Sequence, residues 1–189
     1  MKVYEQDIIE SVSELKRGGI ILYPTDTIWG IGCLVTDEFA IRKIHQLKNR
    51  PLEKKLIVLV NDKEMLQRYV GFLSDKILER LEEESAPTTI IYPNAKDIAD
   101  LLISETGSIA IRIVKDDFCS ELIEKCGCGI TSTSANISND PAPASFKDIS
   151  DEIKSGVDYI VNHKQSDTTK ASPSKILLLK NNEWVEIRS

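Results

Sequence analysis

Leu56-Ile57-Val58-Leu59-Val60 is an unbroken apolar run of strand length. A strand that is apolar at every position is covered on both faces, which is typical of a sheet with helices on each side. On either side of this run, helix-like and strand-like segments alternate along the chain. The sequence therefore predicts an α/β protein with a largely buried sheet, organised as one domain over residues 1–189.

Hydrophobic spacing and capping residues predict the other elements. One helix follows the cap Asp37 and carries Phe39, Ala40, Ile41, Ile44 and Leu47 on one side. The polar stretch from His163 to Ser174, which contains Thr168-Thr169-Lys170, is predicted to be a mobile loop that closes over a bound nucleotide. Further helices are expected at 5–17, 62–69, 74–84, 95–103 and 116–125 and from Ser145 to about Ile153, and further strands at 20–23, 28–34, 88–92, 108–114, 129–132, 157–161, 176–179 and 184–187.

Composition limits the class of protein and its partners. The 189 residues include 24 Lys and Arg against 30 Asp and Glu, a formal net charge of −6. This balance disfavours a broad nucleic-acid surface and favours a local anion site. No stretch approaches the roughly 20 apolar residues that a membrane span needs. The four cysteines show no CxxC pair and no neighbouring His, so we expect a cytoplasmic protein without a zinc site.

Two segments carry clustered polar side chains next to expected strands. Tyr23-Pro24-Thr25-Asp26-Thr27 places three oxygen-bearing side chains in a turn, and Gly30 and Gly32 then permit close approach of backbone or ligand. Thr131-Ser132-Thr133-Ser134-Ala135-Asn136 offers hydroxyls and an amide after an apolar strand. Either segment could also be a turn whose side chains satisfy local backbone amides.

Basic residues suggest where an anionic ligand binds. Lys48, Arg50, Lys54 and Lys55 fall within one short loop, and such a cluster suits a triphosphate. The alternative is a solvated helix C-terminus, where cations are also favourable. Arg112 lies within an apolar strand, so it needs an anionic partner or an edge position, and a ligand carboxylate or phosphate would serve.

Several catalytic classes are disfavoured by what the sequence lacks. His45 and His163 are the only histidines, and neither has the spacing of a metal site or a catalytic triad. There is no G-x-S-x-G, Walker loop or G-x-G-x-x-G. A reaction that depends on positioning and charge stabilisation, without a side-chain nucleophile, remains open.

Taken in order, four segments resemble the short, single-domain form of the YrdC-type threonylcarbamoyl-AMP synthase family. They are Tyr23-Pro-Thr-Asp-Thr-Ile-Trp-Gly-Ile-Gly32, Lys48-Asn-Arg50-Pro, Ser108-Ile-Ala-Ile-Arg112 and Ser132-Thr-Ser-Ala-Asn-Ile-Ser138. The resemblance implies a single twisted mixed β-sheet flanked by helices (YrdC/RibB-like), with a concave central site. It also implies that L-threonine, bicarbonate or CO2, and ATP give threonylcarbamoyl-AMP, pyrophosphate and water.

The same resemblance implies partners and site residues. Mg2+ would accompany ATP without protein ligands, and a separate transferase complex would place the threonylcarbamoyl group on a tRNA adenosine, with direct tRNA contact by this chain as a further candidate. Lys48 and Arg50 would be the catalytic residues. Threonine would be bound by Thr27, Arg112, Ser132 and Ser174, and ATP by Lys48, Arg50, Lys54, Ser108, Ser134, Asn136 and Arg188.

Some positions depart from the family pattern. Lys55 replaces a proline, Leu59 stands where a threonine-contacting His is frequent, Asn139 replaces a glycine and Lys175 a threonine, while Ser85-Ala-Pro-Thr-Thr89 is a reduced form of another motif. We expect activity, with threonine affinity the property most affected. Two other functions stay open: a non-catalytic RNA-binding module of the same fold, and a carbamoyl-AMP enzyme that accepts another amine.

Overall fold

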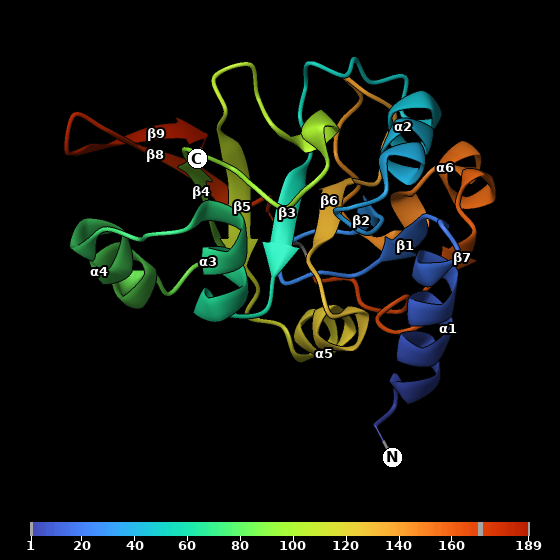
Figure 1. Cartoon of the computed structure of the whole chain (residues 1–189). Helices are drawn as coiled ribbons and strands as arrows, with labels where there is room; N and C mark the ends of the chain where they lie inside the picture. The colour runs from blue at the N-terminus through green and yellow to red at the C-terminus, as the bar shows by residue number, and fades with distance from the viewer. Residues whose placement is uncertain (1, 170–171, 189) are drawn as a thin grey trace.

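The computed structural model of the protein describes residues 2–169 and 172–188. Within these residues, nine strands form one sheet in the order β7-β1-β2-β6-β3-β5-β4-β8-β9, with the apolar strand β3 at its centre (Figure 1). Three neighbouring pairs, β1–β7, β3–β5 and β4–β8, are parallel, and the other pairs are antiparallel. The predicted α/β class with one mixed sheet is therefore confirmed.

Among the described residues, no helix combines the length and apolar character needed to cross a membrane.

Most elements lie within a few residues of the predicted positions. The helices are α1 (Glu5–Lys16), α2 (Glu38–Leu47), α3 (Lys63–Val70), α4 (Asp75–Glu83), α5 (Asp117–Cys126) and α6 (Asp151–Gly156), with short 3₁₀ turns η1 (Asp100–Leu102) and η2 (Phe146–Asp148). The strands are β1 (Ile21–Tyr23), β2 (Gly30–Gly32), β3 (Ile57–Val60), β4 (Thr88–Tyr92), β5 (Ile109–Ile113), β6 (Ile130–Ser134), β7 (Tyr159–Ile160), β8 (Lys175–Lys180) and β9 (Glu183–Arg188).

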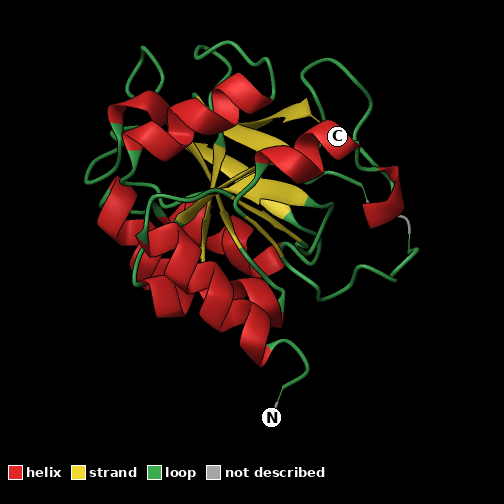
Figure 2. Ribbon diagram, turned by 90° about the vertical axis from the view of Figure 1, so that its right-hand side faces the viewer, coloured by secondary structure: helices red, strands yellow, loops and turns green. Residues whose placement is uncertain are grey.

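Helices lie on both sides of the sheet (Figure 2). α1 and α5 pack together, α3 and α5 contact β3, and α2 contacts β2. The cover is uneven, because the residues of the edge strand β9 are mostly exposed, whereas Val58, Leu59 and Val60 of β3 are fully buried. One end of the sheet is thus open to solvent, close to the C-terminal strand.

The strands β1, β2 and β6 approach each other closely at Gly32. The Tyr23 hydroxyl donates to the carbonyl oxygen of Thr131 over 2.9 Å, and the Cys33 N–H donates to the Thr131 hydroxyl over 2.9 Å. A methyl group added to Gly32 would lie 2.1 Å from that carbonyl oxygen, and one added to Gly30 would lie 2.9 Å from a serine hydroxyl of β6. The two glycines therefore permit close approach of protein to protein at this point.

The helix predicted over 95–103 is wrong except for the short turn η1. Asn94 and Asp97 have positive φ angles of 58° and 55°, which interrupt a right-handed helix. The N–H of Ala95 donates to Gly107, and the N–H of Ala99 donates to Val35, so these groups bond across loops and not along a helix.

The helix predicted from Ser145 to about Ile153 is also wrong as a single element. Its residues form η2 and α6, because Ile149 and Ser150 between them are extended and the Ser150 hydroxyl caps α6 at Ile153 N. Phe39 was predicted on the buried side of α2 but is 88% exposed. It lies three and four residues from Arg42 and Lys43, and so belongs to the polar stripe of that helix.

The segment 163–174 starts from an anchored base. Asp7 of α1 is buried and accepts hydrogen bonds from the Tyr159 hydroxyl, from the backbone and side-chain amides of Asn162, and from His163 N. The described residues of segment 163–174 form neither helix nor strand. Lys170, part of the predicted mobile loop, lies outside the described residues. The mobility of this segment stays a prediction.

Candidate functional site

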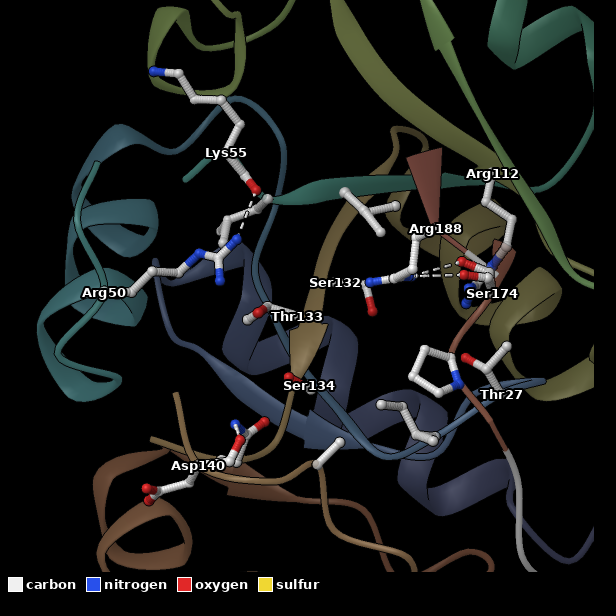
Figure 3. Close-up of a pocket in the computed structure, with 16 residues that line it drawn as sticks. Thr27, Arg50, Lys55, Arg112, Ser132, Thr133, Ser134, Asp140, Ser174 and Arg188 are labelled. Carbon is white, nitrogen blue, oxygen red and sulfur yellow. Dashed lines mark hydrogen bonds between the residues drawn. The ribbon is translucent and has the colours of Figure 1, made fainter. Parts of the chain in front are cut away.

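One pocket gathers most of the residues that the sequence singles out (Figure 3). It lies where the end of β6, the loop before β3 and the strands β5 and β9 come together, although these segments are far apart in the chain. Eight predicted binding residues line it: Thr27, Arg50, Arg112, Ser132, Ser134, Asn136, Ser174 and Arg188. The other lining residues are Ile28, Lys55, Leu56, Ile57, Thr133, Asp140, Ala142 and Pro173.

Arg112 of β5 is paired with a buried carboxylate from the first polar turn. Its Nη2 lies 3.0 Å from Asp26 Oδ1, and the two side chains are only 4% and 8% exposed. The pair lacks hydrogen-bond geometry, and Arg112 Nε is buried without a partner among the described residues. The mid-strand arginine thus has an anionic partner inside the protein and still has a donor for a ligand.

The turn that carries Asp26 is ordered by its threonines. The Thr25 hydroxyl accepts from Thr27 N over 3.0 Å and donates to Ile28 O over 2.8 Å. The Thr27 hydroxyl lies 2.8 Å from it and must then donate, because the only hydroxyl hydrogen of Thr25 is already used. Thr27 Oγ1 therefore offers the pocket an acceptor, which suits an ammonium group.

Arg50 is the basic side chain of the loop after α2 that points into the pocket. Its Nε donates to Lys54 O over 2.7 Å and its Nη2 to Lys55 O over 3.0 Å, and these two bonds fix the guanidinium. Figure 3 shows this group directed toward β6, whereas the Lys55 ammonium points away from the pocket. Lys54 does not line the pocket, and its ammonium donates to Asn139 Oδ1 over 3.2 Å. Burial lowers the pKa of Arg50.

Most of the hydroxyl-rich segment 131–136 belongs to strand β6. The alternative interpretation of this segment as a turn is therefore wrong for residues 131–134. Ser132 and Ser134 belong to β6, where side chains two residues apart share a face. Beyond the strand, the Asn136 amide donates to Ile137 O and to Asp140 O, each over 2.8 Å. Asn136 Oδ1 is buried without a partner in the described structure, so it can accept a hydrogen bond from a ligand.

Ser174 is held on the opposite side of the pocket by two strands. Its hydroxyl lies 2.8 Å from that of Thr89 in β4. Arg188 of β9 donates to Ser174 O from Nε over 3.1 Å and from Nη2 over 2.7 Å. Burial, and the nearby positive charge of Arg112, lower the pKa of Arg188. Two guanidinium groups therefore lie near each other at this end of the pocket.

Two predicted ATP-binding residues do not line the pocket, in addition to Lys54. Ser108 precedes β5, and its hydroxyl lies 2.7 Å from that of Ser104. Lys48 is only 1% exposed, and its ammonium donates to the carbonyl oxygens of Ser134 and Asn136.

Sequence reasoning missed several lining residues, among them Ile57, Asp140 and Pro173. The period of a strand could have identified Ile57, because its neighbour Val58 is fully buried on the other face. Asp140 and Pro173 lie in loops whose path depends on tertiary contacts, and no sequence signal marks them.

The described residues do not fit a dedicated magnesium site. No group of three or more His, Cys, Asp or Glu side chains in the described structure could hold a metal. Asp140 is the acidic residue among those that line the pocket, and Figure 3 shows its carboxylate turned away from the arginines. Mg2+ is usually bound by one or two carboxylates together with substrate phosphates and water, and a carboxylate turned away from the arginines is not placed to share such a metal with an anion that they hold.

Comparisons with known proteins agree on one family. The family model Sua5_yciO_yrdC, described as "Telomere recombination", matches residues 13–189. A curated protein of Idiomarina loihiensis named Threonylcarbamoyl-AMP synthase is 31% identical over 180 residues, which cover 94% of this chain and 96% of that protein.

Solved structures share the fold. Sua5 from P. abyssi, complexed with L-threonine, superposes with a TM-score of 0.87 at 21% identity over 100% of this chain. E. coli YciO superposes with a TM-score of 0.85 at 21% identity, over 97% of this chain and 89% of its own. This chain spans 55% of the Sua5 chain, little more than half.

Proposed function

Because this chain belongs to the Sua5/YciO/YrdC family, we propose that it is a nucleotidyltransferase that makes threonylcarbamoyl-AMP. Its substrates are then L-threonine, ATP and CO2 or bicarbonate, and its products threonylcarbamoyl-AMP and pyrophosphate, with one water released when bicarbonate is dehydrated to supply the CO2. A curated relative of that name matches nearly the whole chain, and a solved neighbour of the same fold carries L-threonine.

One observation carries this proposal beyond family membership: Arg50, Arg112 and Arg188 line a single pocket. Guanidinium groups grip carboxylates and phosphates in bidentate fashion. The hydroxyls of Ser132 and Ser134 lie between the arginines along β6 (Figure 3). A triphosphate and an amino acid can therefore bind side by side, with the strand end between them.

The chemistry needs alignment and no protein nucleophile. The threonine amine loses a proton and adds to CO2 to give a carbamate. A carbamate oxygen then forms a bond to the α-phosphorus of ATP, and the bond from that phosphorus to the β-phosphate bridge breaks as pyrophosphate leaves. Holding both reactants in line and compensating the phosphate charge supply the rate enhancement.

At the threonine end, Arg112 holds the substrate carboxylate, with help from Ser132 and Ser174. Thr27 Oγ1 accepts from the ammonium group. Leu59, which takes a position where a histidine is frequent in the family, is fully buried beside Arg112 in the register of β3 and β5. It offers no hydrogen bond, so threonine affinity is the property that this departure weakens.

At the nucleotide end, Arg50 is the proposed catalytic residue, since its fixed guanidinium points into the pocket toward β6, whereas Lys48 does not line the pocket. Ser134 and Asn136 complete this end, Arg188 is proposed to contact the nucleotide from its place beside Arg112 at the other end, and Lys54 and Ser108 are outer contacts. Mg2+ is proposed to enter bound to ATP, where phosphate oxygens and water supply its ligands.

The product implies a place in tRNA modification. A mixed anhydride of a carbamate and a phosphate transfers its carbamoyl group readily, and a separate transferase complex would pass it to a tRNA adenosine. The cytoplasm is the compartment that we propose, because all four cysteines are free, as is usual in a reducing environment.

The test is a pyrophosphate-release assay with purified protein, ATP, bicarbonate and each of several amino acids. Threonine-dependent release is the expected result. Release that depends on another amine would point to a related carbamoyl-AMP enzyme, and tight tRNA binding without any release would point to an RNA-binding module. Either outcome would overturn the proposal.

A further inference from the structure

Lys48 is among the largest fully buried side chains of the protein. It is 1% exposed and does not line the pocket, although it belongs to the basic loop. Burial, and then the charge of Arg50, lower the pKa of Lys48 to about 7. A lysine is removed from water in this way only where acceptors are placed to receive its N–H groups.

The acceptors are backbone carbonyls of a segment that lies far away in the chain. The ammonium donates to Ser134 O and Asn136 O, 86 and 88 residues further along. The backbone adds a third link, because Ser138 N donates to Lys48 O over 2.7 Å. These bonds join the end of β6 to the loop that follows α2.

The two segments joined in this way form one end of the pocket. Ser134 and Asn136 line it from the β6 side, and Arg50, two residues after Lys48, lines it from the loop side. Their relative position decides whether these groups can contact one ligand together. Lys48 makes two of the side-chain bonds between these segments, and Lys54 makes one, from its ammonium to Asn139 Oδ1.

We propose that Lys48 is a positioning residue, which braces residues 134–138 against the loop that carries Arg50. Two of its three N–H groups are used on carbonyl oxygens, and its side chain is closed off from solvent. Lys48 thus acts on the phosphates through Arg50, Ser134 and Asn136, and does not contact them. The inference rests on the proposed function only for the identity of the ligand.

The first test is amine acylation of the wild-type protein, followed by peptide mass spectrometry. Lys54 is exposed, and we expect it to be labelled. Lys48 should stay unlabelled, to less than about a tenth of the Lys54 level, whether ATP is present or absent. The proposal would be overturned if Lys48 were labelled in the free protein and ATP suppressed that labelling, because a lysine that contacts the phosphates directly behaves in that way.

The second test uses Lys48→Met, which keeps most of the length of the side chain without its ammonium, and Lys63→Met as the matched control, because Lys63 pairs with Glu82 and makes no bond to residues 134–140. Without ATP, backbone hydrogen exchange in residues 134–140 should be about tenfold or more faster in Lys48→Met and unchanged in Lys63→Met. Unchanged exchange together with weakened ATP binding would overturn the brace. If Lys48→Met does not fold, the acylation experiment decides alone.

Both readouts are taken on the free protein, so they do not depend on ATP turnover. Rapid exchange in Lys48→Met, with no pyrophosphate release by the wild type, would leave the brace standing and reject the proposed function. If the wild type releases pyrophosphate and Lys48 is labelled only when ATP is absent, the proposed function stands and the brace is rejected.

Discussion

The two ends of the pocket compensate positive charge in different ways. At one end Arg112 faces the buried carboxylate of Asp26 at 3.0 Å. At the other end Arg50 is held by the carbonyl oxygens of Lys54 and Lys55, which fix the guanidinium but carry no net charge. The Arg112 end, balanced at that residue, suits a zwitterion such as an amino acid, and the uncompensated Arg50 end suits a polyanion. Arg188 lies beside Arg112 but contacts only the oxygens of Ser174, so its charge is also free for an anion. Selectivity therefore follows from what stands behind each arginine.

The largest effect is expected where the balanced end is broken. Arg112→Met leaves Asp26 as a buried charge without its partner, so the free energy of unfolding should fall by about 3–5 kcal/mol. Threonine binding should be lost as well. Urea unfolding and titration calorimetry with threonine measure the two effects.

The double variant Arg112→Met with Asp26→Asn sharpens this result. It removes both charges, so most of the stability should return while threonine binding stays absent. Arg188→Met is the matched control, because Arg188 contacts the carbonyl of Ser174 and should lose much less stability. A single Arg112→Met variant as stable as the wild type would show that the ion pair does not balance this end.

The uncompensated end should respond in the opposite way. Arg50→Ala removes no partner from a carboxylate, so the free energy of unfolding should change by no more than about 1 kcal/mol. ATP affinity should fall by roughly 10- to 100-fold, which corresponds to one or two charged hydrogen bonds. Calorimetric titration with ATP checks this, with Lys63→Ala, from a surface ion pair, as the control. Unchanged ATP affinity would remove Arg50 from the phosphate role.

Low pH should lower the stability of the protein at the start of segment 163–174, where Asp7 holds the backbone. The other end of this segment, Ser174, lies at the balanced end of the pocket. Burial alone would raise the pKa of Asp7, but the hydrogen bonds from Asn162, Tyr159 and His163 outweigh it and lower the pKa. The stability that this carboxylate contributes is therefore complete above its unfolded pKa of about 3.9 and is lost as the pH falls through the lower folded value.

In Asp7→Asn that acid-dependent part should disappear, and the variant should be about 2–3 kcal/mol less stable at pH 7. Denaturation curves between pH 2.5 and 7 are the measurement. A variant with the same pH dependence as the wild type would assign the acid transition to other carboxylates, such as Asp116.

The smallest effect concerns closure over the ligands. If segment 163–174 closes when both ends of the pocket are filled, ATP with threonine should slow its proteolysis several-fold, and either ligand alone should slow it less. Limited digestion followed by mass spectrometry measures this. Equal cleavage rates in all four conditions would argue against closure.

Local pattern was enough to predict the fold class and most elements. Continuous apolar runs marked the buried strands, and Asp37, Asp62 and Asp116 cap the helices that follow them. The misses at 95–103 and 145–153 share one cause. In the first region backbone N–H groups donate to carbonyl oxygens of other loops, and in the second the Ser150 hydroxyl starts a new helix. The spacing of apolar residues does not indicate such hydrogen-bond partners.

The site was predicted as a set of residues better than as a set of contacts. Residue type placed Arg50 and Arg112 near an anion and Ser134 near a small polar ligand, and the structure brings all three to one pocket. Their roles remain predictions. The partnership of Arg112 with Asp26, 86 positions earlier, and the inward course of Lys48 depend on how strands are ordered in the sheet, which local sequence does not encode.

Gly32 has a consequence for how variants of this protein should be interpreted. Because even a single added carbon would collide with the neighbouring strand, every substitution there is expected to abolish the protein in cells through misfolding. In a growth-based mutational scan this position would rank with the arginines of the pocket, although it touches no substrate. Measuring protein abundance beside growth would separate the two kinds of intolerance.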